Sequence, residues 1–274
     1  MKLEVADLLS EVASRLKHID SPRKEAMLLL AHYLAKDQLW VATNLRSSVE
    51  VGEEFFALVK RREEYEPLEY ITKKVSFYSR EFFVDKGVLI PRPETELLID
   101  EVLKNLPDLD AKVRFCEVGV GSGIVSVMLA LLYKNATILA VDLSNEALKI
   151  AKKNAKKFGV EDRVEFRHSD LLSEVGEKID YLVSNPPYIA DDFELEPNLS
   201  YEPREALFGG EVGDEMIKKL LDEVLRRDIN LFSCEMGYDQ KDKIATYINT
   251  KPHKNISFYR DYSGFDRGFT LRLS

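Results

Sequence analysis

The sequence has few cysteines, no long apolar segment and no excess of basic residues, and each shortage excludes a class of protein. It contains two cysteines, Cys116 and Cys234, which lie in the separate apolar runs VRFCEVG and LFSCEMG. Such contexts indicate reduced, buried thiols rather than a disulfide, which argues against a disulfide-stabilised secreted protein. No stretch approaches the length that crosses a bilayer, and the N-terminus MKLEVADLLSEV lacks the basic and apolar regions of a signal peptide. We therefore expect a cytoplasmic protein without membrane contacts.

Basic residues are outnumbered as well. The chain has 39 Lys and Arg against 48 Asp and Glu, which gives a formal net charge of -9. A surface that neutralises nucleic-acid phosphates needs clustered Lys and Arg, so this balance argues against direct DNA or RNA binding, although it leaves room for a local basic patch. With 274 residues, 45% of them apolar, one large or two modest domains with a real core are expected.

The chain changes character twice along its length. Residues 1–66 have apolar positions at helical spacing, and Ser21 followed by Pro22 marks the start of a second helix. Residues 67–90 alternate aromatic and β-branched residues with charges, which predicts a β-hairpin linker. Residues 91–274 begin with a helix and then alternate strands and helices, interrupted by a long polar loop at 189–212. This alternation predicts a doubly wound, Rossmann-like α/β sheet whose ligand lies at the carboxyl ends of the strands.

A glycine-rich turn follows the first strand of that region. In EVGVGSG, residues 117–123, three glycines let the backbone approach a ligand and turn tightly into a helix. Ile124 stands where a dinucleotide fingerprint has its third Gly, which favours a ligand without a pyrophosphate. S-adenosylmethionine is such a ligand, and Glu117 suits its methionine end. Asp142 closes the second strand 19 positions after Gly123, where a carboxylate can accept both ribose hydroxyls, and Asp170 closes the third near the expected adenine.

The segment SNPPYIA, residues 184–190, is suited to hold an NH2 group. A planar amide or ring amine is a poor nucleophile because its lone pair is delocalised, so its orientation matters. Asn185 can accept one N–H through its side-chain oxygen, and the carbonyl of Pro186, directed outward by Pro187, can accept the other. Tyr188 would supply an aromatic wall and a cation–π contact with the sulfonium. A simple Pro-Pro turn after a buried strand is the competing interpretation of the tetrapeptide alone.

Together these motifs resemble the HemK/PrmC family of glutamine N5-methyltransferases that modify peptide chain release factors. The likeness extends from about residue 67 onward, is weaker in the N-terminal part, and rests on PLEYI, FYSREFFVDKGVLIPRPETE, EVGVGSG, AVDLS, VSNPPYI, YEPREALFGG and RDYSGFDR. It implies a class I S-adenosylmethionine-dependent methyltransferase domain at 91–274, a hairpin linker at 67–90 and a helical substrate-recognition domain at 1–66. The implied enzyme methylates the glutamine in the GGQ loop of class 1 release factors, as a monomer and without a metal.

The resemblance also assigns site residues. Those for the substrate amide are Asn185, Pro186, Pro187 and Tyr188, with Arg92 and Glu94 added from IPRPETE. Those for the cofactor are Glu117, Gly119, Val120, Gly121, Ser122, Gly123, Asp142, Asp170, Leu171 and Asn185.

The chain departs from the family pattern at three places. Lys73 stands where the family usually has Gly, EVGDE at 211–215 replaces the more usual DGL, and Leu171 replaces an aromatic residue that some members have. The first two affect linker and loop geometry, and the third weakens stacking on adenine. None removes a group that the chemistry requires.

Other functions stay open at this level. Adenine N6-methyltransferases of DNA or RNA use the same NPPY logic but need a basic groove and a target-reading insert, and neither is evident here. A glutamine methyltransferase of a ribosomal protein would share these motifs, and only the N-terminal helices could distinguish it. A non-catalytic cofactor-binding protein would be expected to have a degraded NPPY, whereas this one is intact.

Overall fold

A computed structural model describes residues 1–274, which form two compact units. Unit 1 comprises residues 1–74 and 196–201, and unit 2 comprises residues 75–195 and 202–274. The division at residue 74 falls inside the segment predicted as a linker. None of the helices combines the length and apolar character that a membrane span requires.

Unit 1 is mainly helical. Its helices are α1 (Val5–Arg15), α2 (Pro22–Tyr33), α3 (Gln38–Thr43), α4 (Glu53–Glu63) and α5 (Leu68–Thr72), and they enclose a separate apolar core. Pro22 is the first residue of α2, as the sequence predicts. The unit also contains a short antiparallel pair, β1 (Lys2–Glu4) with β2 (Ser48–Glu50), which the sequence analysis did not include. Three-residue strands are too short to show an alternating pattern in the sequence, so only the structure reveals this pair.

A hairpin follows α5. Its strands are β3 (Lys74–Phe77) and β4 (Arg80–Phe83), joined by Tyr78 and Ser79, whose φ angles of 51° and 58° are those of a tight two-residue hairpin turn. Lys73, at the position where the family usually has Gly, has a left-handed φ of 60° at the end of α5. A side chain in this conformation costs about 1 kcal/mol relative to glycine, which explains the family's preference.

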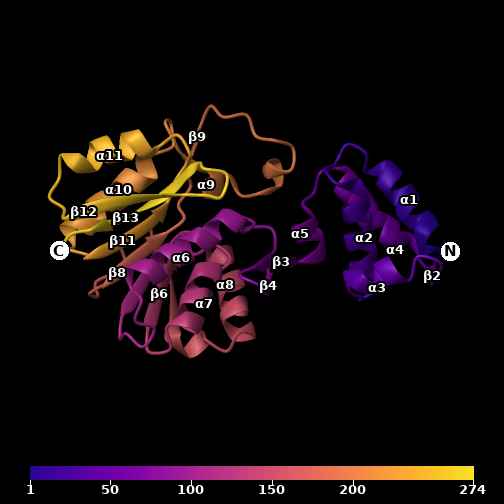
Figure 1. The fold of residues 1–274 in the computed structure, drawn as a ribbon, viewed down its shortest axis with the longest axis horizontal. Coiled ribbons are helices and arrows are strands. Elements are labelled where there is room, and N and C mark those ends of the chain that lie inside the picture. The colour runs from indigo at the N-terminus through magenta and orange to yellow at the C-terminus, as the bar shows by residue number, and fades with distance from the viewer. The chain divides into compact units, whose positions relative to one another are not determined.

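Unit 2 is built on one seven-stranded sheet in the order β12-β13-β11-β8-β5-β6-β7 (Figure 1). The strands are β5 (Arg114–Val118), β6 (Thr137–Asp142), β7 (Val164–His168), β8 (Tyr181–Ser184), β11 (Leu231–Glu235), β12 (Asn255–Arg260) and β13 (Asp266–Arg272). Neighbouring strands from β11 to β7 are parallel, whereas β13 runs antiparallel to both of its neighbours. The predicted doubly wound α/β sheet is therefore confirmed.

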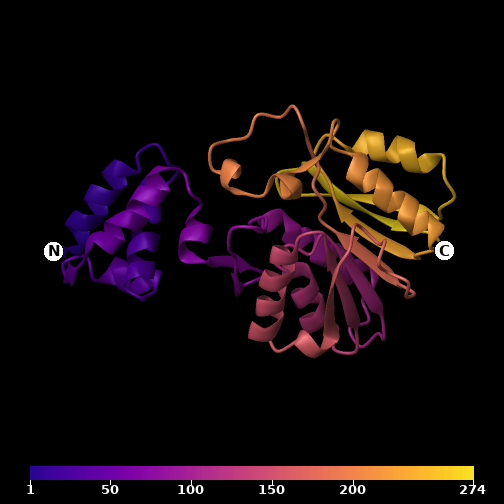
Figure 2. The same ribbon diagram turned by 180° about the vertical axis from the view of Figure 1, so that it is seen from behind.

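Helices cover both faces of this sheet (Figures 1 and 2). One face packs against α6 (Glu96–Asn105), α7 (Ile124–Leu132) and α8 (Asn145–Lys157), and the other against α10 (Glu215–Arg226) and α11 (Lys241–Asn249). Successive strand residues alternate between the two cores, so that Phe115 faces the first and Cys116 the second. Cys116 and Cys234 are buried free thiols, as predicted.

Short elements complete unit 2 near the ends of the strands. They are η1 (Pro93–Thr95), η2 (Glu161–Arg163), α9 (Arg204–Leu207) and the parallel pair β9 (Ile189–Ala190) with β10 (Phe208–Gly210), while η3 (Leu199–Tyr201) belongs to unit 1. Part of the segment predicted as a polar loop therefore forms short helices and strands. A Cβ added at Gly209 or Gly213 would lie 2.5 Å from the carbonyl oxygen of Pro187 or Tyr188 respectively. These two glycines therefore allow the loop to pack directly on the NPPY backbone, and EVGDE retains the second of them.

Candidate active site

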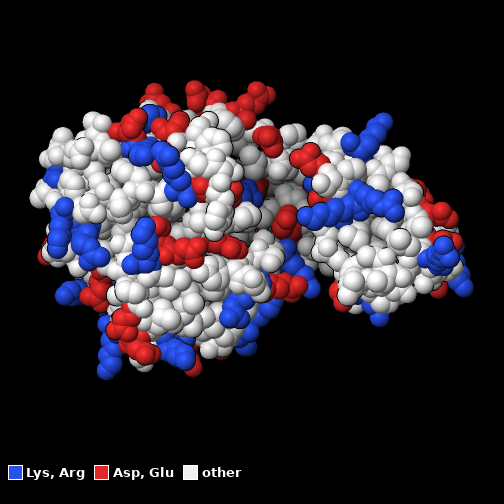
Figure 3. All heavy atoms as spheres, viewed as in Figure 1, with Lys and Arg blue, Asp and Glu red and all other residues white.

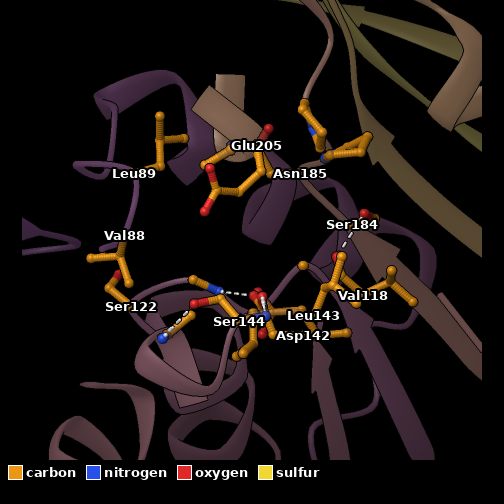
Figure 4. A pocket seen from close by; sticks show the side chains of 18 of the residues that line it. Val88, Leu89, Val118, Ser122, Asp142, Leu143, Ser144, Ser184, Asn185 and Glu205 are labelled. Carbon is orange, nitrogen blue, oxygen red and sulfur yellow. Dashed lines mark hydrogen bonds between the residues drawn. The ribbon is translucent and has the colours of Figure 1, made fainter. Parts of the chain in front are cut away.

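A cavity of about 460 Å³ lies at the carboxyl ends of the central strands of unit 2 (Figure 4). Val118, Asp142 and Ser184 line it, and they are the last residues of β5, β6 and β8. The chain order of the strands reverses between β5 and β8, which is where open α/β sheets bind their ligands. The sheet topology therefore places the cavity where the sequence analysis expects a ligand.

The glycine loop forms one wall of the cavity. Gly119, Gly121 and Gly123 have φ angles of 75°, 52° and 81°, which favour glycine. A Cβ added at Gly123 would lie 2.8 Å from the Cβ of Ala151, so this glycine permits α7 and α8 to pack closely. A Cβ added at Gly121 would meet no atom within 4 Å. Gly121 lines the cavity, so its missing side chain leaves space for a ligand.

Asp142 is fixed by the same loop. Its Oδ2 accepts a hydrogen bond from the amide of Gly121 at 2.9 Å, and its Oδ1 accepts one from the amide of Ser144 at 2.8 Å (Figure 4). Burial raises the pKa of Asp142, while these backbone hydrogen bonds lower it and favour the anion. The result is an oriented carboxylate with lone pairs left for a ligand's hydroxyl groups.

Glu117 lies deeper in the same wall. Its side chain is only 2% exposed, and Oε2 accepts a hydrogen bond from the amide of Ser126 at 2.8 Å and another from the Ser126 hydroxyl. Burial raises the pKa of Glu117 to about 8, and the charge of Asp142 adds to the rise. A nearby cationic group would oppose this rise, so Glu117 favours a positively charged ligand.

The charge of the lining supports the same conclusion. Its acidic residues are Glu117, Asp142, Asp170 and Glu205, and it contains no Lys or Arg. A nucleotide phosphate needs basic side chains or a cradle of amide groups, whereas S-adenosylmethionine is cationic at its sulfonium and ammonium groups. The open space at Gly121 and the oriented carboxylate of Asp142 therefore fit this cofactor.

Asn185 lies across the cavity from Asp142 (Figure 4). Its Nδ2 donates a hydrogen bond to Oγ1 of Thr95 at 3.1 Å, while its Oδ1 is buried without a hydrogen-bond partner. An unsatisfied buried acceptor costs about 1–3 kcal/mol. A ligand N–H group would remove that cost, and Pro186 and Pro187 line the cavity beside it.

Tyr188 does not line the cavity. Its hydroxyl donates to Oε1 of Glu235 at 3.2 Å, its carbonyl accepts from Nε2 of Gln240 at 2.9 Å, and its ring packs against the core under α10 and α11. Burial, followed by the neighbouring Glu235 carboxylate, raises the pKa of Tyr188 far above its ordinary value. The structure thus places Tyr188 in support of the NPPY turn, and its predicted role as an aromatic wall stays a prediction.

Arg92 and Glu94 also lie outside the lining. Arg92 Nη2 donates to Oε1 of Glu202 at 2.5 Å, and the amide of Ile90 donates to Oε2 of the same carboxylate at 2.8 Å. Glu202 thereby ties the IPRPETE segment to the segment whose Pro203 and Glu205 line the cavity. Asp170 and Leu171 do line it, as predicted, and Leu171 has a left-handed φ of 48°.

Sequence reasoning did not identify Thr95, Glu202 or Glu235. Glu235 is the last residue of β11, as Asp142 is of β6, so the rule that polar residues at strand ends face the ligand edge could have found it. Thr95 directly follows Glu94 in a motif already noted. Glu202 lies in YEPREALFGG, another motif already noted, but nothing in the sequence indicates its ion pair with Arg92, which joins positions 110 residues apart.

Comparisons with known proteins agree with this geometry. Residues 92–200 match the Methyltransferase small domain, and residues 7–72 match the PrmC N-terminal domain. The Release factor glutamine methyltransferase of Clostridium acetobutylicum is 32% identical over 97% of this chain and 97% of its own length. The protein of that name in Clostridium botulinum is 37% identical over 97% of this chain and 98% of its own length. Among solved structures, the N-terminal domain of human METTL16 in complex with SAH has the same fold, with a TM-score of 0.53 and 15% identity over 70% of this chain and 75% of that chain.

Proposed function

Since this chain belongs to the release factor glutamine methyltransferase family, we propose that it methylates the side-chain nitrogen, N5, of the glutamine in the GGQ loop of class 1 peptide chain release factors. It is an enzyme that uses S-adenosylmethionine as the methyl donor. The observation that supports an amide substrate is the buried, unpartnered Oδ1 of Asn185 at a cavity lined by acidic groups. Release factors act in translation, so we place the reaction in the cytoplasm.

The cofactor would be held by the wall opposite Asn185. When bound, S-adenosylmethionine supplies an electrophilic methyl group on a sulfonium. Asp142 would accept hydrogen bonds from the ribose hydroxyls, and Glu117 would face the methionine end. Gly121 would let the cofactor approach the backbone, because no side chain fills that space.

The residues of the NPPY segment would orient the glutamine. Oδ1 of Asn185 would accept one N–H of the substrate amide, and the carbonyl of Pro186 would accept the other. Both hydrogen bonds together direct the nitrogen lone pair along the line of attack, which is the main catalytic device available for so weak a nucleophile. No base is needed before the transfer, since the product nitrogen can lose its proton afterwards.

Unit 1 is the proposed recognition unit for the release factor. Every residue that lines the cavity belongs to unit 2, so we expect cofactor binding not to require unit 1. One glutamine side chain offers too little surface to select a single protein, and the additional contacts must come from elsewhere. Unit 1 has a core of its own and matches the PrmC N-terminal domain over residues 7–72.

Leu39 provides a test of this role. It lies on α3 of unit 1 and is 69% exposed. If α3 takes part in recognition, Leu39→Lys should lower kcat/KM for the intact release factor by about 5- to 30-fold, the effect of losing one apolar interface residue. A short peptide with the GGQ sequence should be methylated at an unchanged rate. Equal loss on both substrates would contradict the role.

The adenine-methylating alternative is not favoured. The cavity lining contains no basic residue, and basic and acidic side chains are interspersed over unit 2 on the face in Figure 3. A nucleic-acid substrate requires a cluster of Lys and Arg along its backbone path. The named relatives that cover nearly the whole chain modify release factors.

The decisive experiment is mass spectrometry of a purified release factor after incubation with the enzyme and S-adenosylmethionine. We expect one added methyl group, located on the glutamine of the GGQ loop, and none on a release factor in which that glutamine is replaced by alanine. Parallel reactions with ribosomal proteins and with adenine-containing RNA test the alternatives. Methylation of either one, with an unmodified release factor, would overturn the proposal.

A further inference from the structure

Behind the NPPY segment lies a chain of polar groups that the transfer reaction does not use directly. Thr95 of η1 is 2% exposed, and its Oγ1 accepts the hydrogen bond from Nδ2 of Asn185. A hydroxyl that accepts in this way still has its own hydrogen to donate. The Thr95 hydroxyl also lowers the pKa of the Glu235 carboxylate, which makes Glu235 the acceptor to consider for that hydrogen.

Glu235 has one oxygen available for this hydrogen. The residue is 2% exposed at the end of β11, and Tyr188 donates to its Oε1. Its Oε2 is buried and has no hydrogen-bond partner. A hydrogen bond from the Thr95 hydroxyl is the interaction that would satisfy Oε2.

The direction of this chain decides which end of the Asn185 amide faces the substrate. While Thr95 accepts from Nδ2, Oδ1 is left free, and it can accept an N–H of the glutamine. If Thr95 instead donated to Oδ1, Nδ2 would be left free for the substrate. Two N–H donors would then face each other, and no hydrogen bond could form. An acceptor for the Thr95 hydrogen is needed to prevent that reversal.

We propose that Thr95 and Glu235 are positioning residues that fix the Asn185 amide with Oδ1 toward the substrate, Thr95 accepting from Nδ2 and donating to the Glu235 carboxylate. This inference rests on the proposed function and adds two residues to it. Neither residue needs to touch the reacting nitrogen. Thr95 also lines the cavity, but its proposed effect on the reacting nitrogen passes through Asn185.

The arrangement makes the orientation sensitive to pH. Burial raises the pKa of Glu235 to about 7, with Glu94 of η1 raising it further and Thr95, Tyr188 and Arg267 of β13 lowering it. The phenol of Tyr259 on β12 and the thiol of Cys234 are also close, and both stay neutral because their own pKa values are raised. A protonated Glu235 donates a hydrogen instead of accepting one. Methyl transfer should therefore slow as the pH falls through about 7.

The first test compares two variants at Thr95 in single-turnover reactions with saturating substrates. Thr95→Val keeps the shape but removes the hydroxyl, and we expect the transfer rate to fall about 10- to 100-fold, as expected for lost orientation of a reacting group. Thr95→Ser keeps the hydroxyl and should recover most of that rate. Cofactor affinity, measured by calorimetry, should stay close to that of the wild type in both. Equal rates for the two variants would overturn the proposal.

The second test is the pH profile of the Glu235→Gln variant. The glutamine oxygen can still accept from Thr95 but does not titrate. The single-turnover rate of the wild type should therefore fall as the pH drops through about 7, which gives its pH profile an acidic limb. The profile of the variant should lack this limb. Persistence of that limb in a folded, cofactor-binding variant would contradict the role of Glu235.

A third measurement needs no substrate, so it separates this inference from the proposed function. In ¹⁵N-labelled protein, the side-chain NH2 signals of Asn185, assigned by their loss in Asn185→Ala, should exchange slowly in the wild type and in Thr95→Ser. They should exchange rapidly in Thr95→Val. Slow exchange in all three proteins would overturn the inference even if release factor is methylated. Rapid exchange only in Thr95→Val would support it even if release factor is not.

Discussion

The two sides of the cavity differ in how their polar groups are satisfied. On the cofactor side, both oxygens of Asp142 accept hydrogen bonds from backbone amides, and Glu117 accepts from Ser126. On the amide side, Oδ1 of Asn185 and Oε2 of Glu235 are buried without a partner. The groups of the first side are paired before any ligand arrives, whereas on the second side Oδ1 of Asn185 is left for a substrate donor and Oε2 of Glu235 for the hydrogen of Thr95.

This difference separates binding from orientation. A wall whose carboxylates are already oriented can bind a cofactor without reorganisation, so its residues should contribute to affinity. An open buried acceptor such as Oδ1 of Asn185 costs free energy in the resting protein, and a substrate amide relieves that cost when it is held in the reactive orientation. Substitutions on the amide side should therefore change the rate, and those on the cofactor side the affinity.

The largest effect is expected for Asn185→Ala. Removing the acceptor leaves the substrate nitrogen unoriented, and the transfer rate should fall about 10²-fold or more. Cofactor affinity by calorimetry should stay near that of the wild type. If the variant turns over at the wild-type rate with saturating substrate, the amide side does not control the rate as proposed.

Asp142→Ala is the counterpart on the cofactor side. Loss of hydrogen bonds to a charged acceptor should weaken cofactor binding by roughly 1.5–3 kcal/mol. The single-turnover rate at saturating cofactor should change much less. Calorimetry that finds unchanged affinity in the folded variant would remove Asp142 from the binding site.

Glu117 gives a pH-dependent test of the same side. Its pKa is about 8 in the folded chain against 4.5 for an ordinary Glu, so its contribution to stability is complete below about pH 4.5 and is lost as the pH rises through 8. Glu117→Gln lacks this titration. Without cofactor, the free energy of unfolding of the variant should exceed that of the wild type by about 1–3 kcal/mol near pH 8 and by less near pH 5. Urea unfolding measures this difference. A constant difference between these pH values would show that Glu117 does not titrate as a buried acid.

The same contrast explains what the sequence could and could not predict. The cofactor side comes from consecutive segments, in which β5, its glycine loop and α7 are followed by β6 and Asp142, so spacing alone locates it. The NPPY segment is equally local. The supporting groups are not, because Thr95, Tyr188 and Glu235 come from η1, the turn after β8 and the end of β11. Their proximity depends on strand order, and the aromatic-wall role predicted for Tyr188 does not take into account the buried acid that its hydroxyl contacts.

The smallest effect is expected for Tyr188→Phe, which keeps the aromatic ring and removes only the hydrogen bond to Glu235. The loss of one neutral donor should cost about 0.5–1.5 kcal/mol of stability and leave cofactor affinity unchanged. Because that hydrogen bond lowers the pKa of Glu235, its removal should raise this pKa and move the acidic limb of the transfer rate to higher pH. Tyr188→Leu provides the matched comparison. If the ring serves as a wall for the sulfonium, only the leucine variant should also lose cofactor affinity, whereas similar affinities in both variants would limit Tyr188 to the support of Glu235. A limb that stays in place in Tyr188→Phe would mean that the hydroxyl does not control the ionisation of Glu235.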